Sequence, residues 1–150
     1  MSDAPDQQKD APSTSQVGRT KDAGWQIGVS KTIDRPVDEV WDFVTSPAGV
    51  AIWLGEGVTL LNEKGTAYET KDGTRGELRS FRELTRVRVT WQPEDWSHET
   101  TLQLAVTATS AGKARLVVHQ ERLADAAERE RQRAHWQNVV NQLVVALTAG

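Results

Sequence analysis

The stretch RPVDEVWDFVTSPAGVAIWLGEG, residues 35–57, predicts two short helices followed by a glycine stop. Ser46 is placed to cap the second helix and Gly55 to end it. Trp53 stands at the end of that helix, in a segment too short to form a core helix by itself. A large aromatic residue there either packs over the end of a sheet or faces a ligand. In the first helix, apolar residues recur at i, i+3, i+4 and i+7 and form one stripe: Val37, Val40, Trp41 and Val44.

Strand patterns lie on both sides of these helices. WQIGVSKTI, residues 25–33, alternates as a half-buried strand does. Between residues 58 and 121, turn residues such as Asp72-Gly73 separate further strand-like segments. Short turns predict an antiparallel meander, joined at one edge by the first strand. The segments are VTLL, TAYET, RGELRSF, RVRVTW, ETTLQLAVTA and ARLVVHQE.

DAAERERQRAHWQNVVNQLVVALTAG, residues 125–150, predicts one long helix. Asp125 and Glu128 have the spacing of a capping box, with Asp in place of Ser or Thr. An apolar sheet face and an apolar helix stripe predict an α+β fold: a curved antiparallel sheet of about seven strands wrapped round the long C-terminal helix. A sheet that curves round one helix often leaves a pocket. The predicted helix stripe is Trp136, Val140, Leu143, Val144 and Leu147.

Composition limits the classes of function. The chain has 150 residues, of which 37% are hydrophobic and 26% charged, as in a single globular domain. It has no cysteine, which excludes disulfides, thiol catalysis and thiolate metal sites. A net charge of −3 without a strongly basic stretch argues against a nucleic-acid partner. No apolar run approaches the roughly 20 residues that cross a bilayer, and a secretory signal is not evident. We therefore expect a cytoplasmic protein without membrane insertion.

The first residues differ in composition from the rest. Residues 1–23 are rich in Pro, Ser, Asp, Gln and Lys, and only Met1 and Val17 are large and apolar. Such a segment buries too little surface to offset its ordering entropy. We expect a disordered tail over 1–23 and one domain over 24–150.

Several segments carry a resemblance to a known family: TIDRPVDEVWDFVTSPAGVAIWLGEG, GTAYETKDGTRGELRSF, RVRVTWQPEDWSHETTLQL, ARLVVHQERL and RQRAHWQNVVNQLVVAL. Together, over residues 25–148, they resemble the START-like, helix-grip superfamily (SRPBCC), and within it the bacterial branch related to the activator of the heat-shock protein 90 ATPase. The resemblance implies a hydrophobic cavity between sheet and long helix. It also implies binding of apolar small molecules there and, in some members, cyclisation or hydrolysis. Gln120 stands where similar proteins often have a histidine, which weakens transfer of a titrating role.

Five side chains are candidates to line this cavity. The resemblance places the second short helix at the cavity mouth, so Trp53 would line or cover it. A buried Tyr68 hydroxyl needs a partner. The inward-pointing amide of Gln120 must be hydrogen-bonded, either internally or by a ligand. Trp91 and Trp136 each belong to an apolar face and are expected to meet inside. The candidates are Trp53, Tyr68, Trp91, Gln120 and Trp136.

Other polar residues do not form a reactive set. In DWSHE, Asp95, Ser97 and His98 are neighbours in an expected loop, where side chains diverge, and no G-x-S-x-G elbow is present. The histidines His98, His119 and His135 lack metal-ligand spacing. The sequence therefore predicts no catalytic residue, no metal and no cofactor.

Three functions remain open. The leading hypothesis is non-catalytic binding of an apolar or amphipathic small molecule between the sheet and the C-terminal helix. The alternative is a co-chaperone or protein-interaction module of the heat-shock protein 90 activator type, with a small, dry cavity and an outer binding surface. The third is a cyclase or hydrolase acting on a polyketide-like substrate. That activity would need Glu77, Arg79 or His119 to point inward.

Overall fold

The computed structural model describes residues 19–20, 24–59, 63–110 and 112–149. The strand, two helices, meander and long helix follow one another as predicted, and the fold is α+β. The elements are β1 (Arg19–Thr20), β2 (Gly24–Ile33), α1 (Val37–Val44), α2 (Pro47–Trp53), β3 (Ala67–Glu69), β4 (Arg75–Arg82), β5 (Arg86–Trp91), β6 (Thr100–Ser110), β7 (Lys113–Leu123) and α3 (Ala126–Ala149).

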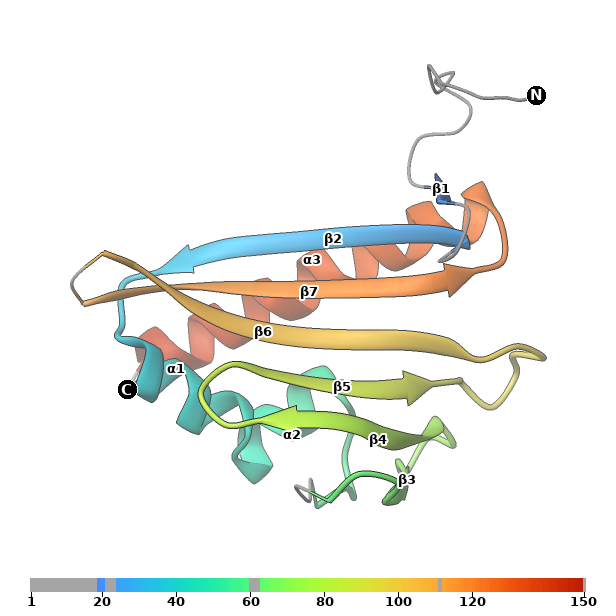
Figure 1. The fold of residues 1–150 in the computed structure, drawn as a ribbon, viewed down its shortest axis with the longest axis horizontal. Helices are drawn as coiled ribbons and strands as arrows, with labels where there is room; N and C mark the ends of the chain where they lie inside the picture. The colour runs from blue at the N-terminus through green and yellow to red at the C-terminus, as the bar shows by residue number, and fades with distance from the viewer. Residues whose placement is uncertain (1–18, 21–23, 60–62, 111, 150) are drawn as a thin grey trace.

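The strands form one antiparallel sheet in the order β1-β2-β7-β6-β5-β4-β3 (Figure 1). The meander runs from β3 to β7, and β2 joins it beside β7. Leu104 of β6 pairs with Val118 of β7, and Val106 pairs with Leu116. Because side chains alternate along a strand, this register puts the apolar residues of both strands on one face.

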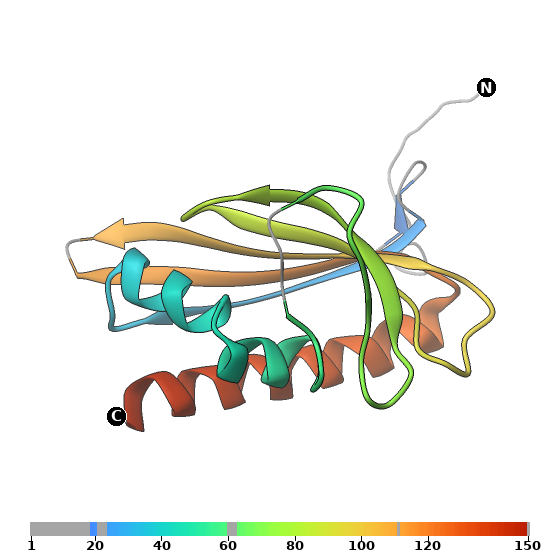
Figure 2. The same cartoon turned by 90° about the horizontal axis from the view of Figure 1, so that it is seen from below.

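The long helix α3 lies across that apolar face (Figure 2). At its start, the Asp125 carboxylate accepts the backbone N–H of Glu128 at 2.8 Å. The Glu128 carboxylate in turn accepts the backbone N–H of Ala124 at 2.9 Å. The predicted capping box is therefore present, although the return bond goes to the residue before the cap. No helix in the described part of the chain is both long and apolar enough to cross a membrane.

The two short helices pack tightly against each other. Helix α1 buries Val40, Trp41 and Val44, as its stripe predicts. The Ser46 hydroxyl caps α2 by accepting the backbone N–H of Gly49 at 3.2 Å. A Cβ atom on Gly49 would lie 2.0 Å from a backbone oxygen of α1, so only glycine allows this approach.

Two expected segments, 58–61 and 1–23, lie partly outside the described residues. Residues Val58 and Thr59 of the expected strand 58–61 are not in a strand, and the following residues lie outside the described ones. Within the expected tail, Arg19 and Thr20 pair with Trp25 and Gly24 as the short strand β1. The rest of residues 1–23 lies outside the described residues, so disorder there stays a prediction.

Candidate functional site

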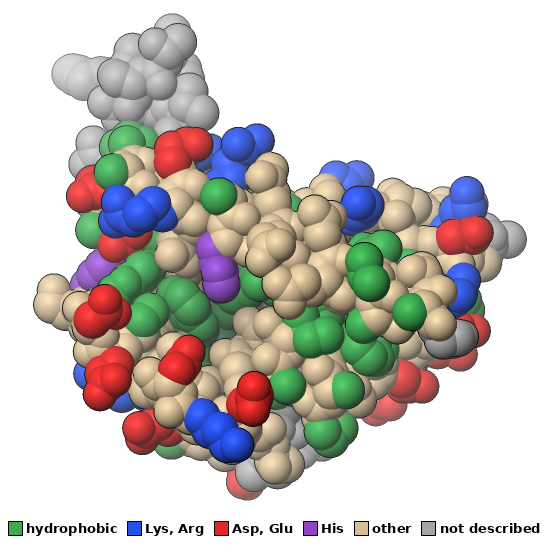
Figure 3. Space-filling view, turned by 180° about the vertical axis from the view of Figure 1, so that it is seen from behind, with side chains coloured by type: hydrophobic (Ala, Val, Ile, Leu, Met, Phe, Trp, Pro, Cys, Tyr) green, Lys and Arg blue, Asp and Glu red, His purple; other side chains and the backbone are tan. Residues whose placement is uncertain are grey.

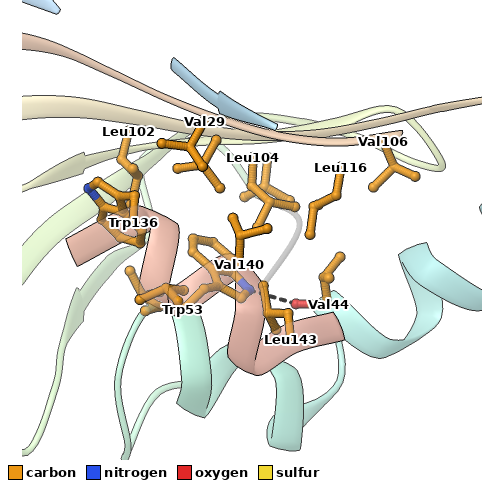
Figure 4. Close-up of a cluster of buried hydrophobic side chains, with 14 of the residues drawn as sticks. Val29, Val44, Trp53, Leu102, Leu104, Val106, Leu116, Trp136, Val140 and Leu143 are labelled. Carbon is orange, nitrogen blue, oxygen red and sulfur yellow. Dashed lines mark hydrogen bonds between the residues drawn. The ribbon is translucent and has the colours of Figure 1, made fainter. Parts of the chain in front are cut away.

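Buried apolar side chains of the described residues lie between the sheet and α3. Figure 4 shows residues of β6 and β7 facing residues of α2 and α3 across this interior. Each of these side chains is at most 3% exposed. These described side chains therefore pack together at the place where the resemblance implies a cavity. The residues are Leu102, Leu104, Val106 and Leu116 on the sheet, and Trp53, Trp136, Val140 and Leu143 on the helices.

Two of the candidates, Gln120 and Trp136, are bonded to each other in this interior. The indole N–H of Trp136 donates to Gln120 Oε1 at 2.7 Å. The Gln120 amide donates to Thr100 Oγ1 at 2.9 Å, and the Thr100 hydroxyl donates to the Trp91 carbonyl at 2.7 Å. Both candidates are fully buried. The amide is thus satisfied internally, as buried polar groups require, and needs no ligand.

Trp53 joins the core and the surface. Its side chain is 3% exposed, and its indole N–H donates to the carbonyl of Val44, the last residue of α1, at 2.7 Å (Figure 4). This bond fixes α2 against α1. A small part of the ring nevertheless borders a surface hollow. Trp53 is therefore mainly a packing residue that also borders this hollow.

The hollow beside Trp53 has a volume of about 260 Å³. It lies between α2, the turn that joins β3 to β4, the end of β5 and the side of α3. Figure 2 shows that turn reaching below the sheet to the level of α3, and Figure 3 shows a hollow floored by hydrophobic side chains. We call it the α2 hollow. Its lining includes the apolar residues Ile52, Trp53, Leu54 and Trp91, which we call its floor, and the polar residues Glu56, Asp72, Thr74 and His135, which we call its rim.

Trp91, one of the floor residues, packs in a cluster of aromatic rings. The Trp91 ring centroid lies 5.7 Å from that of Trp136 and 5.4 Å from that of Trp96, both edge-on. The ring of His135 lies 6.3 Å away. Burial of one side of His135 lowers its pKa below the usual value, because desolvation disfavours the charged imidazolium. The lowered pKa favours the neutral imidazole of His135 at pH 7.

Asp72 is fixed on the rim by its own turn. The Thr70 hydroxyl donates to Asp72 Oδ1, and the backbone N–H of Thr74 lies 3.3 Å from the same oxygen. These bonds to the ionised form lower the pKa of Asp72, with the Thr70 bond the largest cause. Gly73 follows at φ +93°, a conformation that favours glycine. The turn chemistry that makes the hairpin thus also holds a negative charge beside the apolar floor.

Tyr68 lies apart from the α2 hollow. Its hydroxyl donates to the carbonyl of Thr90 at 2.5 Å, and burial, with a smaller contribution from Glu99, raises its pKa well above the usual range. It borders a separate hollow of about 480 Å³ whose lining includes Arg75, Glu77 and Glu99. Of the five candidates, the structure thus brings Trp53 and Trp91 together in one hollow, while Tyr68 lines another.

The remaining ionisable candidates do not reach the interior. His98 Nε2 lies 2.7 Å from the Glu128 carboxylate, and its ring stacks on Trp96. His119 Nε2 contacts the Gln26 side chain at 3.0 Å, and Arg79 pairs with Glu77 at 2.5 Å near solvent. In residues 19–20, 24–59, 63–110 and 112–149, no group of three or more His, Asp or Glu side chains is placed to hold a metal.

Sequence reasoning did not assign Asp72 and His135 to a site. Asp72 belongs to the Asp-Gly turn signal, which accounts for the residue without any role in a site. His135 precedes Trp136 on α3 and therefore lies to one side of the apolar stripe. Only the folded arrangement puts both residues in the lining of the same hollow as Trp91.

Residues 34–148 match the family of activator of Hsp90 ATPase homolog 1-like proteins. The chain belongs to this family. No curated protein matches the chain.

Solved structures share the fold at low sequence identity. CalU16 from Micromonospora echinospora is 19% identical with a TM-score of 0.71, over 87% of this chain and 82% of that one. PFC0360w, an HSP90 activator from Plasmodium falciparum, is 14% identical with a TM-score of 0.67, over 81% and 95%. DynU16 from the dynemicin biosynthetic locus is 23% identical with a TM-score of 0.69, over 83% and 48%, so this chain spans about half of DynU16. At these identities the likeness shows the fold alone.

Proposed function

We propose that the protein binds a small molecule whose apolar part occupies the α2 hollow, without catalysing a reaction on it. The observation that carries the proposal is that Trp53 and Trp91 both line one hollow that opens to solvent. Apolar surface near solvent favours burial by a ligand, because removing it from water lowers the free energy.

The size of the hollow limits the ligand. Its volume of about 260 Å³ is slightly below the roughly 300–1,000 Å³ of common small-molecule sites. The inserted part is therefore small, on the order of one or two rings. A longer molecule would leave the rest of its chain in solvent beyond the rim.

The packed interior favours a second function, a protein-interaction module. Such a module needs no internal cavity, and the fold neighbour PFC0360w is an HSP90 activator. On this alternative, the α2 hollow would receive a side chain of the partner rather than a free molecule. Both functions fit a cytoplasmic location, which stays a prediction.

The test is a titration with prodan, a neutral naphthalene dye whose fluorescence reports an apolar environment. Ala51 of α2 lines the hollow, whereas Ala48 of the same helix is exposed and does not line it. Ala51→Leu should fill the hollow while keeping a good helix former. Ala48→Leu is the matched control, with the same change on the same helix.

We expect saturable binding to the wild type and to Ala48→Leu, and weaker binding by at least about tenfold in Ala51→Leu, because the added side chain takes the ligand's volume. Thermal unfolding of all three proteins checks that the fold is kept. Absence of saturable binding to the wild type would contradict the proposal. The alternative would then be measured as a change in the ATPase rate of purified heat-shock protein 90 on addition of the domain.

A further inference from the structure

We propose that the ligand of the α2 hollow carries a positively charged ammonium group next to its apolar part. The inference rests on the proposed function of the same hollow and adds the charge of the ligand to it. The two statements are separable, because a neutral apolar molecule fits the first and not the second.

Carboxylates stand on the rim of the hollow. Glu56 follows α2, and Asp72 comes from the opposite turn, so the two acids approach from different elements. Glu94 packs against the same turn, since a Cβ atom on Gly73 would lie 2.8 Å from its Oε1. Figure 3 shows acidic side chains gathered along one side of the hollow. An anionic ligand would be repelled here, whereas a cation would be attracted.

The positively charged side chain near this rim, Lys71, forms only a weak ion pair. Lys71 Nζ lies 3.8 Å from Glu56 Oε1, but the two side chains are 76% and 72% exposed. A pair so exposed is well solvated and contributes little. His135 also lines the hollow, and its lowered pKa favours the neutral imidazole. The carboxylate of Glu56 is therefore not neutralised by a buried cation, and an incoming ammonium group can pair with it.

The apolar floor strengthens this preference. Trp53 and Trp91 both line the hollow, and each side chain is less than one-tenth exposed. Charges interact more strongly where the surroundings are less polar, and indole rings attract cations through their π electrons. The hollow therefore combines an apolar base with a negative edge, which is the complement of an amphipathic cation.

The groove on the opposite side of α3 has the reverse character. About 450 Å³ in volume, it runs between β2 and α3 and is lined by Lys31 and Arg133, with the amides of Gln137 and Asn141. These side chains offer cations and hydrogen-bond donors. The acidic rim of the α2 hollow is thus a local feature, and it is not a simple result of the net charge of −3.

The test uses three probes that share one ring system and differ in charge: 1-naphthylmethylammonium, 1-naphthalenemethanol and 1-naphthoate. Binding is followed at pH 7.5 through the backbone amide chemical shifts of α2 and of residues 70–74. Asp72→Asn removes the charge but keeps an oxygen that can accept the two turn hydrogen bonds. Glu83→Gln, in the exposed turn between β4 and β5, is the control with the same change in net charge.

We expect the ammonium to bind at least about fivefold more tightly than the alcohol, and the naphthoate to bind most weakly, as one nearby charge pair implies. Asp72→Asn should remove most of the ammonium's advantage, and Glu83→Gln should keep it. Equal binding of ammonium and alcohol, or an equal effect of both variants, would overturn the inference and leave the apolar site in place. Absence of saturable shifts with all three probes would overturn the proposed function as well.

Discussion

The sheet–α3 interior and the α2 hollow both contain tryptophan, but the tryptophans differ in their contact with the surface. In the interior, Trp136 is fully buried and its N–H is bonded to Gln120. In the hollow, Trp53 is 3% and Trp91 7% exposed, so each is a core residue with one edge at the surface. The described interior side chains pack and bond among themselves, whereas Trp53 and Trp91 also reach the lining of a surface hollow.

Polar groups show the same difference. The interior amide and hydroxyl of Gln120 and Thr100 bond only to protein atoms. On the rim of the hollow, Asp72 has its turn bonds and is otherwise exposed, and Glu56 is exposed as well. A satisfied buried network stabilises the fold, whereas the exposed charges on the rim remain in contact with solvent.

The largest expected effect tests whether Trp53 belongs to the interior. Trp53→Ala should lower the free energy of unfolding by about 3–5 kcal/mol, because it creates a cavity and removes the bond to Val44. Ile52→Ala, on the same helix and half-exposed, should lower it much less. Urea unfolding curves measure both. A loss below about 2 kcal/mol for Trp53→Ala would place this ring in the hollow rather than in the core.

The second prediction concerns the hydrogen-bond network of Gln120, Trp136 and Thr100 in the interior. Gln120→Met keeps the side-chain length but leaves the Trp136 N–H without its acceptor, which should cost about 1–3 kcal/mol of unfolding free energy. Gln103→Met is the control on the outer face of β6, where the amide bonds Arg88 near solvent, and should cost less. Equal losses measured by chemical denaturation would show that the buried network adds no stability of its own.

The smallest effect concerns the rim. Because the folded-state pKa of His135 is lowered, the unfolded chain takes up a proton at this residue before the folded one does. Its contribution to stability is therefore constant above the ordinary histidine pKa of about 6.5 and declines as the pH falls below it. The wild type should lose more stability between pH 7 and 5.5 than His135→Gln, measured by urea midpoints. The difference between the two proteins should stay constant from pH 7 to 8, and a parallel decline below pH 7 would contradict the shift.

Much of the fold follows from local patterns. The stripe of α1, the Ser46 cap, the hairpin at Asp72-Gly73 and the cap of α3 all appear where the sequence predicts them. These features depend on residues close together in the chain, so their physics is visible in the sequence. The expected strand at 58–61 differs at Val58 and Thr59, because a short apolar run alone does not supply a pairing partner.

The candidate site was less accessible to prediction. The inward direction of Gln120 followed from alternation along its strand, but whether protein or ligand would satisfy its amide did not. Tyr68 and Trp91 were both expected near a cavity, yet they line different hollows. Such outcomes depend on how side chains from distant segments fill the space between them.

By itself, the sequence determined the order of elements, the apolar faces, the turns and the family resemblance, because each depends on spacing along the chain. Only the tertiary structure decided that Trp136 would bond Gln120 in the interior, and that Asp72 and His135 would line the same hollow as Trp53 and Trp91. Packing decides such contacts, since they join residues from different elements whose separation is fixed only when sheet and helices come together.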